Sequence, residues 1–244
     1  MYFEKIKKKI YFFKFLLFSF FKVDVIKSAY QVYFFKNYSD TTFKFYIIGK
    51  YGYKYWNHIS NIEYPFQFID IGSNQGLYAI GASKNDNCKK SYAFEPIENS
   101  FYLLKKNLEL NNIFKCEAYN LGISNSVGET DMDYDPLHSG AATINSGNHN
   151  KSIKINIINH LKLNEIINYK IPIFIKIDVE GHEEVVIKEI LKTNFKNEIK
   201  EIYFEMDERW SSYDDIVKLL SDNGFTKYEK SKNNAIHYDV LVRR

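Results

Sequence analysis

The feature that most constrains the fold is an alternation of two kinds of segment from residue 66 onward. Short runs of β-branched or aromatic residues alternate with longer amphipathic stretches, a pattern typical of strands separated by helices. The run 171–181, IPIFIKIDVEG, is almost continuously apolar, as parallel strands buried on both faces are. The pattern therefore predicts an α/β fold with an open, doubly wound sheet.

Seven segments have the length and composition of strands in such a sheet. They lie at residues 66–72, 91–96, 116–123, 171–181, 201–206, 225–230 and 237–244. The last two flank a short polar turn at 231–234, which predicts a C-terminal antiparallel hairpin at one edge of the sheet. The polar, glycine-containing passage 124–150 is expected to hold a further hairpin and a loop on the substrate side.

Residues 1–60 are expected to form a basic, aromatic, helical extension of one domain that spans residues 61–244. The apolar run 10–21 is interrupted by Lys14, precedes no small-x-small cleavage site, and is shorter than the about 20 residues of a membrane span. Residues 1–36 contain eight lysines against two acidic residues. Two interpretations therefore remain open: a helix lying on an anionic membrane surface, and a helix packed on the domain.

The distribution of charge limits which partners the chain can bind, and the cysteine content indicates its cellular compartment. Beyond residue 36 the chain carries 25 basic and 28 acidic residues, so we expect no nucleic-acid partner, whose binding requires many phosphate contacts. Cys88 and Cys116 form neither a disulfide framework nor a zinc-ligand pattern. We therefore expect a cytoplasmic protein, with peripheral contact at the inner membrane face through residues 1–36 as an open alternative.

Polar residues at the ends of two neighbouring strands point to a cofactor. In FIDIGSNQG, Gly72 and Gly76 permit a tight turn close to a ligand, with Asp70 beneath it. Glu95 ends the next strand, where a carboxylate can accept hydrogen bonds from both hydroxyls of a ribose. The spacing G-x-x-x-G lacks the glycines of a pyrophosphate site. A carboxylate that binds a ribose, in a site without a binding loop for phosphates, fits S-adenosylmethionine.

Five segments together resemble a known series of motifs. They are FIDIGSNQGLYAI, AFEPIENSFYLLKKNLELNN, NLGISNSVGE, SGAATI and IKIDVEGHEEVVIKEI. This series resembles that of the FkbM-type, class I S-adenosylmethionine-dependent methyltransferases over about residues 66–206. The resemblance implies a seven-stranded Rossmann-like methyltransferase fold. It also implies that Asp70, Gly72, Asn74 and Gly76 surround the methionine end of the cofactor, that Glu95 holds the ribose, and that Asn120, Leu121 and Gly122 border the adenine.

A hydroxyl that accepts a methyl group needs a base, which adds on the order of 10²- to 10⁴-fold in rate. The segment IDVEGHE offers Asp178, Glu180 and His182. Asp178 ends the central strand, so it is a candidate for the base, with anchoring of the following loop as the alternative role. His138, in the passage DPLHSGAAT, can enter from the substrate side. No second strand offers an Asp-Asp or Asp-Asn pair, so we predict no metal site.

The absence of two motifs limits the class of molecule that can accept the methyl group. The four prolines are never adjacent, so the Asn/Asp-Pro-Pro-aromatic loop of many nucleobase and amide methyltransferases is missing. Neither cysteine ends a strand, as carbon-five methylation of pyrimidines requires. The resemblance implies O-methylation, and we expect a sugar, nucleotide-sugar or surface-glycan hydroxyl as the acceptor. A small-molecule or amino acceptor, and a non-catalytic cofactor-binding protein at the membrane, are the alternatives; the oligomeric state is left open.

Overall fold

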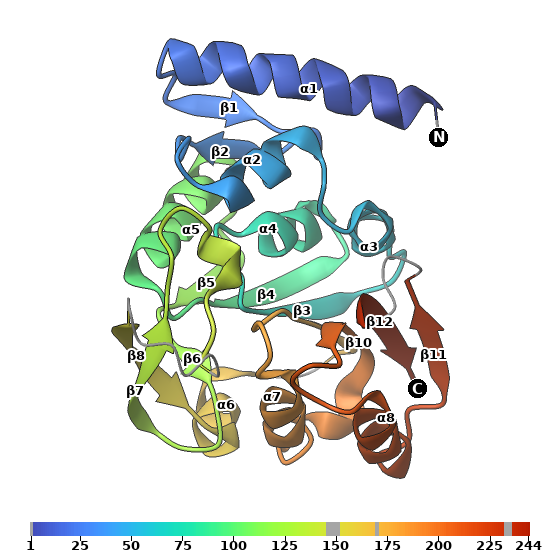
Figure 1. Cartoon of the computed structure of the whole chain (residues 1–244). Helices are drawn as coiled ribbons and strands as arrows, with labels where there is room; N and C mark the ends of the chain where they lie inside the picture. The colour runs from blue at the N-terminus through green and yellow to red at the C-terminus, as the bar shows by residue number, and fades with distance from the viewer. Residues whose placement is uncertain (1, 145–151, 169–170, 232–235) are drawn as a thin grey trace.

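A seven-stranded sheet forms the centre of the protein (Figure 1). The computed structural model describes residues 2–144, 152–168, 171–231 and 236–244. The order of the strands in the sheet is β11-β12-β10-β9-β3-β4-β5. Their bounds are β3 Phe66–Ile71, β4 Cys88–Phe94, β5 Cys116–Tyr119, β9 Ile173–Ile177, β10 Ile199–Asp207, β11 Lys227–Lys230 and β12 His237–Arg243. The predicted doubly wound α/β sheet is confirmed.

The pairing of the strands also agrees with the sequence pattern. Strands β5, β4, β3, β9 and β10 are parallel, and β12 runs antiparallel to both β10 and β11. The predicted C-terminal hairpin is therefore present, although residues 232–234 of its turn lie outside the described residues. Strand order reverses between β3 and β9, and ligands in open α/β sheets bind beside such a reversal.

Helices cover both faces of the sheet (Figure 1). The helices α3 Tyr53–Ser60, α4 Leu77–Lys84 and α5 Glu98–Leu110 lie on one face, and α6 His160–Ile166, α7 Glu183–Ile190 and α8 Tyr213–Asp222 lie on the other. Alternate side chains of β3 divide between two hydrophobic clusters: Phe66 and Phe68 face α4, whereas Ile69 and Ile71 pack with residues of α7. This division explains why β3 carries apolar residues on both of its faces.

One predicted strand is wrong in its extent. The segment 116–123 divides into β5 and a two-residue strand, β6 Gly122–Ile123, which belongs to a separate three-stranded sheet. The cause is Asn120, whose side-chain amide donates to the backbone oxygens of Glu95 (2.9 Å) and Pro96 (2.9 Å) at the point where the chain leaves the main sheet.

The passage after β6 contains the expected hairpin in a longer form. Strand β7 Gly128–Asp133 pairs antiparallel with β8 Ser152–Ile158, and the short 3-10 helix η1 Ser139–Ala141 lies between them in the chain. Residues 145–151 lie outside the described part of the chain. A second 3-10 helix, η3 Lys196–Glu198, leads into β10.

The first 60 residues contain α1 Tyr2–Phe20, β1 Val25–Lys27, β2 Tyr33–Phe35, α2 Thr41–Ile48 and α3. The extension is therefore not wholly helical, because β1 and β2 form a small antiparallel sheet. Phe34, Phe43 and Ile59 share one buried cluster with residues of β3 and α4. The predicted boundary at residue 60 stays a prediction. None of the helices in the described residues has the length and hydrophobicity that crossing a bilayer requires.

A buried lysine occupies the point where the strand order reverses. Lys176 of β9 is 4% exposed and is the register partner of Asp70 on β3. Its Nζ lies 3.0 Å from Oδ2 of Asp178 and 3.8 Å from Oδ1 of Asp70, and it donates to the backbone oxygen of Gly72 at 3.3 Å. Burial raises the pKa of Asp70 to about 6, and the nearby ammonium opposes that rise. Lys176 thus supplies the counter-charge for two carboxylates.

Replacing this lysine is expected to destabilise the fold. Lys176→Met removes the ammonium and leaves Asp70 and Asp178 without it, so we expect a loss of about 3–5 kcal/mol in the free energy of unfolding in urea. The matched control is Lys188→Met, which breaks an exposed pair with Glu184 and should cost less than about 1 kcal/mol. Equal losses in the two variants would contradict the role given to Lys176.

Candidate active site

A hollow opens at the carboxyl ends of β3, β4 and β9, beside the reversal of strand order. It encloses about 470 Å³ of space not filled by atoms, including space open to solvent. Its lining residues are Tyr46, Tyr51, Gly72, Asn74, Glu95, Pro96, Ile97, Met132, Ser139, Gly140, Ala142, Asp178, Val179 and Glu180. Five of the residues singled out in the sequence meet here: Gly72, Asn74, Glu95, Asp178 and Glu180.

The turn after β3 forms the floor of the hollow. Gly72 has a φ of 73°, and a Cβ atom there would lie 1.8 Å from the backbone oxygen of Asp178, so only glycine fits. Asp70 lies beneath this turn, fully buried, and its Oδ2 accepts the backbone N–H of Ala79 in the first turn of α4 (2.8 Å). Gly76, at a φ of 89°, is the N-cap residue of α4. Asp70 and Gly76 therefore shape the turn without lining the hollow.

Glu95 follows β4 and is 3% exposed. Its Oε2 accepts the backbone N–H of Asn74 at 2.7 Å, and its Oε1 accepts that of Ile97 at 2.9 Å. Burial raises the pKa of Glu95 to about 7, while the two N–H donors oppose the rise. Because a carboxylate has about four lone-pair positions, about two remain for a ligand in the hollow.

One wall of the hollow comes from the N-terminal segment, which the sequence analysis did not connect to the site. Asp40, the N-cap residue of α2, is 1% exposed. Its carboxylate accepts hydrogen bonds from the side chain of Gln75 (2.7 Å) and from both the N–H (3.0 Å) and the hydroxyl (2.8 Å) of Ser139. Asp40 thus joins α2, the turn after β3 and the η1 segment.

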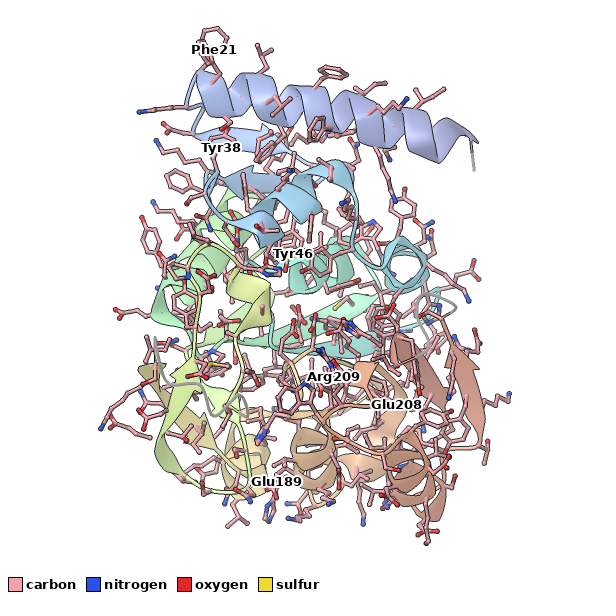
Figure 2. The ribbon with its side chains drawn as sticks, in the orientation of Figure 1. Phe21, Tyr38, Tyr46, Glu189, Glu208 and Arg209 are labelled. Carbon is pink, nitrogen blue, oxygen red and sulfur yellow. The ribbon has the colours of Figure 1, made fainter. Side chains whose placement is uncertain are left out.

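Two tyrosines complete this wall. Tyr46 lies on the side of α2 that faces the sheet (Figure 2), and Tyr51 follows α2 in the chain. Burial raises the pKa of both phenols well above the usual range, so their hydroxyl groups stay protonated. The role of Asp40 could be predicted only in part. An aspartate before an apolar helical run is a signal for an N-cap residue, but nothing local in the sequence indicates the distant partners of its carboxylate.

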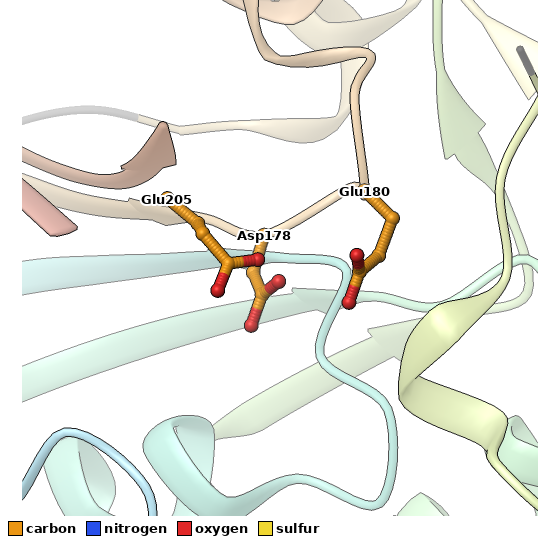
Figure 3. Close-up of side chains that lie close together, drawn as sticks. All are labelled: Asp178, Glu180 and Glu205. Carbon is orange, nitrogen blue, oxygen red and sulfur yellow. The ribbon is translucent and has the colours of Figure 1, made fainter. Parts of the chain in front are cut away.

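Three carboxyl groups converge beside the hollow, and two of them, those of Asp178 and Glu180, line it (Figure 3). One oxygen each of Asp178, Glu180 and Glu205 lie within 4.8 Å of one another. Burial and the charge of Asp178 raise the pKa of Glu180 and of Glu205. Lys176 contacts Asp178, and Nε2 of His237 lies 2.7 Å from Glu205. We call Asp178, Glu180 and Glu205 the acid cluster.

Glu205 was missed in the sequence, although it brings an acid from a second strand, β10, to this edge of the sheet. It lies on β10 between Phe204 and Met206, which are buried on the opposite face of the sheet. An acidic residue that alternates with buried apolar residues, on a strand next to β9, was the signal in the sequence that could have identified Glu205. Three carboxylates so close are also a donor set that a divalent cation accepts. The expectation that the site holds no metal stays a prediction.

The loop that carries two of these acids is held by a further carboxylate. Glu180 has a φ of 49°, a conformation that non-glycine residues rarely adopt. Its backbone oxygen accepts the hydroxyl of Thr143 at 2.6 Å. The side chain of Glu183 accepts the N–H groups of Val179 (3.1 Å) and Gly181 (3.0 Å). These bonds fix the direction in which Asp178 and Glu180 point.

Four further predicted residues lie elsewhere. Leu121, Gly122 and His182 line a second, adjoining hollow of about 320 Å³, which shares Gly72, Pro96, Met132 and Val179 with the first. Nε2 of His182 lies 3.1 Å from the hydroxyl of Ser124, and burial lowers the pKa of this histidine. The ring of His138 packs against Phe45 with centroids 6.4 Å apart. Neither histidine lines the first hollow.

Comparisons with known proteins give the family. Residues 70–227, more than half of the chain, match the model of the Methyltransferase FkbM domain. A protein of Beauveria bassiana described as Methyltransferase 1 is 23% identical over 175 residues, which are 64% of this chain and 64% of that protein. The hexuronic acid methyltransferase AglP of Haloferax volcanii is 30% identical over 177 residues, which are 72% of this chain and 69% of that protein.

A solved structure gives the same fold. The tRNA m1G37 methyltransferase of M. jannaschii has a TM-score of 0.50 and 12% identity, over 89% of this chain and 52% of that chain. Such a likeness shows the architecture alone. The family model and the relatives agree with the motifs and with the hollow beside the strand reversal. The chain therefore belongs to the FkbM methyltransferase family, and its cofactor is S-adenosylmethionine.

Proposed function

We propose that the protein transfers the methyl group of S-adenosylmethionine to a hydroxyl of a sugar or glycan. The observation that carries this proposal is the acid cluster, two of whose members, Asp178 and Glu180, line the hollow. A sugar hydroxyl is a weak nucleophile until its proton is removed. Burial and the charge of Asp178 raise the pKa of Glu180 to about 8 and that of Glu205 to about 10, so the ionised form of each is a stronger base than an ordinary carboxylate.

The two adjoining hollows fit the cofactor. They adjoin and share the lining residues Gly72, Pro96, Met132 and Val179, so one elongated molecule can extend from one into the other. The remaining lone pairs of Glu95 would accept the hydroxyls of the ribose. Leu121 and Gly122 in the second hollow would border the adenine, with Asn120 fixing their backbone. Gly72 and Asn74 would face the methionine end.

When bound, S-adenosylmethionine supplies an electrophilic methyl group on a sulfonium. The acid cluster would take the proton that the acceptor hydroxyl loses as its oxygen bonds to the methyl carbon and the carbon–sulfur bond breaks. Lys176 holds the side chain of Asp178 in place, since its Nζ lies 3.0 Å from Oδ2 of Asp178. Alignment of acceptor and donor supplies the larger part of the rate, up to about 7–11 kcal/mol.

The acceptor class draws support from one relative. The protein of Haloferax volcanii that is 30% identical over 72% of this chain is named for hexuronic acid. A direct test incubates the full chain with the methyl donor and a panel of glycosides of neutral sugars and uronic acids. Mass spectrometry should find a gained methyl group, and fragmentation should place it on a hydroxyl oxygen. Methylation only of amines in a parallel panel would overturn the proposal.

Removing one acid of the cluster should slow the reaction without weakening cofactor binding. Glu205→Gln keeps the size of the side chain and removes its basicity, so we expect kcat to fall by on the order of 10²-fold. Affinity for S-adenosylhomocysteine, measured by calorimetry, should change by less than about threefold, because Glu205 does not line the first hollow. Glu165→Gln, an exposed substitution on α6, is the control. Unchanged kcat in Glu205→Gln would exclude the cluster as the base.

Cofactor affinity should depend on pH through Glu95. Only the ionised carboxylate accepts both ribose hydroxyls, and the pKa of Glu95 is raised to about 7. Lowering the pH from 8 to 6 protonates this group, so the calorimetric Kd for S-adenosylhomocysteine should rise by roughly tenfold. In Glu95→Gln binding should be weaker and nearly independent of pH over this range. A parent protein whose Kd is the same at both values would contradict the assignment.

A further inference from the structure

From residue 6 onward, where its side chains are described, the helix α1 contacts the rest of the protein through one face. Phe15 is 6% exposed and belongs to the buried cluster that contains Phe43, and Tyr11 and Phe18 pack against that cluster. The rings of Phe15 and Tyr38 meet edge to face with centroids 5.6 Å apart. These contacts hold α1 across the top of the molecule in Figure 1, over β1 and α2.

The opposite face of α1 is apolar and exposed. Phe13 is 70% exposed, Leu17 55% and Phe20 81%. Figure 2 shows Phe21, just after the helix, pointing away from the body. The remaining members of this surface are Ile6, Ile10 and Leu16. Positions 6, 10, 13, 17 and 20 recur every three or four residues, so they form one stripe along the helix. A soluble protein rarely leaves so continuous an apolar surface uncovered.

Lysines border this stripe. With 3.6 residues per turn, Lys9 lies along one edge, next to Leu16 and Phe20, and Lys7 and Lys14 lie along the other. The sequence has no aspartate or glutamate from residue 5 to residue 23. A long apolar stripe bordered by lysines, on a segment without acidic residues, complements an anionic lipid surface, where the aromatic groups enter the acyl boundary and Lys9 reaches the headgroups. In the free protein the ammonium group of Lys14 donates to the backbone oxygen of Lys27, and that of Lys7 lies over the ring of Tyr53.

We propose that α1 docks the protein on a membrane surface rich in anionic lipids, lying in the plane of the interface. Attraction of the lysines to the anionic headgroups and burial of the apolar stripe both favour this position. The helix stays attached to the body through Phe15 while its outer face enters the bilayer. This inference does not rest on the proposed acceptor, because it concerns a face of the molecule that carries none of the acid cluster.

The test is sedimentation of the full chain with vesicles of neutral phosphatidylcholine and with vesicles that also contain phosphatidylglycerol. The protein should pellet with the anionic vesicles at least about tenfold more strongly than with the neutral ones, and added salt should weaken this binding. The double variant Phe13→Ser, Leu17→Ser should lose at least about tenfold in vesicle affinity. Both side chains are exposed, so unfolding in urea and binding of S-adenosylhomocysteine should not change.

A matched control changes exposed apolar side chains elsewhere. The variant Phe114→Ser, Leu161→Ser removes residues that are 88% and 59% exposed and should bind vesicles as the parent does. Absence of binding to anionic vesicles, or equal binding by both double variants, would overturn the proposal. A third outcome would also overturn the proposal: light scattering detects a dimer of the parent protein that does not bind vesicles, and the variant Phe13→Ser, Leu17→Ser is a monomer. The stripe would then pair with a second copy of the chain.

Discussion

The site depends on the charge of one buried ammonium group, that of Lys176. This group lies where the strand order reverses, and it contacts Asp70 and the backbone oxygen of Gly72 at the end of β3 and Asp178 at the end of β9. Buried carboxylates that lack a counter-charge cost several kcal/mol or take up a proton. Lys176 therefore lets the turn after β3 and the loop after β9 approach within van der Waals contact, which is also why a Cβ atom at Gly72 has no room.

Much of the fold could be predicted from the sequence because strands buried on both faces carry apolar residues on both faces, as β3 and β9 do. The exception at residues 116–123 has a specific cause. Its residues suit a single strand, but the amide of Asn120 binds backbone oxygens that follow β4 and turns the chain toward another sheet. Local periodicity carries no information about such a partner. The short strands β1 and β2 were missed because only three residues of each pair.

The candidate site was predictable where it follows from strand ends. Glu95 and Asp178 each come directly after a parallel strand, and topology alone brings them to one edge of the sheet. Asp40 and Glu205 could not be placed in this way, because one caps a helix far earlier in the chain and the other is an interior residue of a strand. The sequence also contained a signal for Lys176 that was not used. A lysine inside an apolar strand is buried only when acidic side chains pair with it.

The central claim is that one hollow orients an adenosyl sulfonium between Glu95 and the acid cluster. It is tested most directly by a crystal structure of the full chain with S-adenosylhomocysteine. The structure should place the ribose hydroxyls within hydrogen-bond distance of Glu95 and the sulfur on the side of Asp178. An adenosyl group bound elsewhere, or one whose ribose makes no contact with Glu95, would contradict the claim.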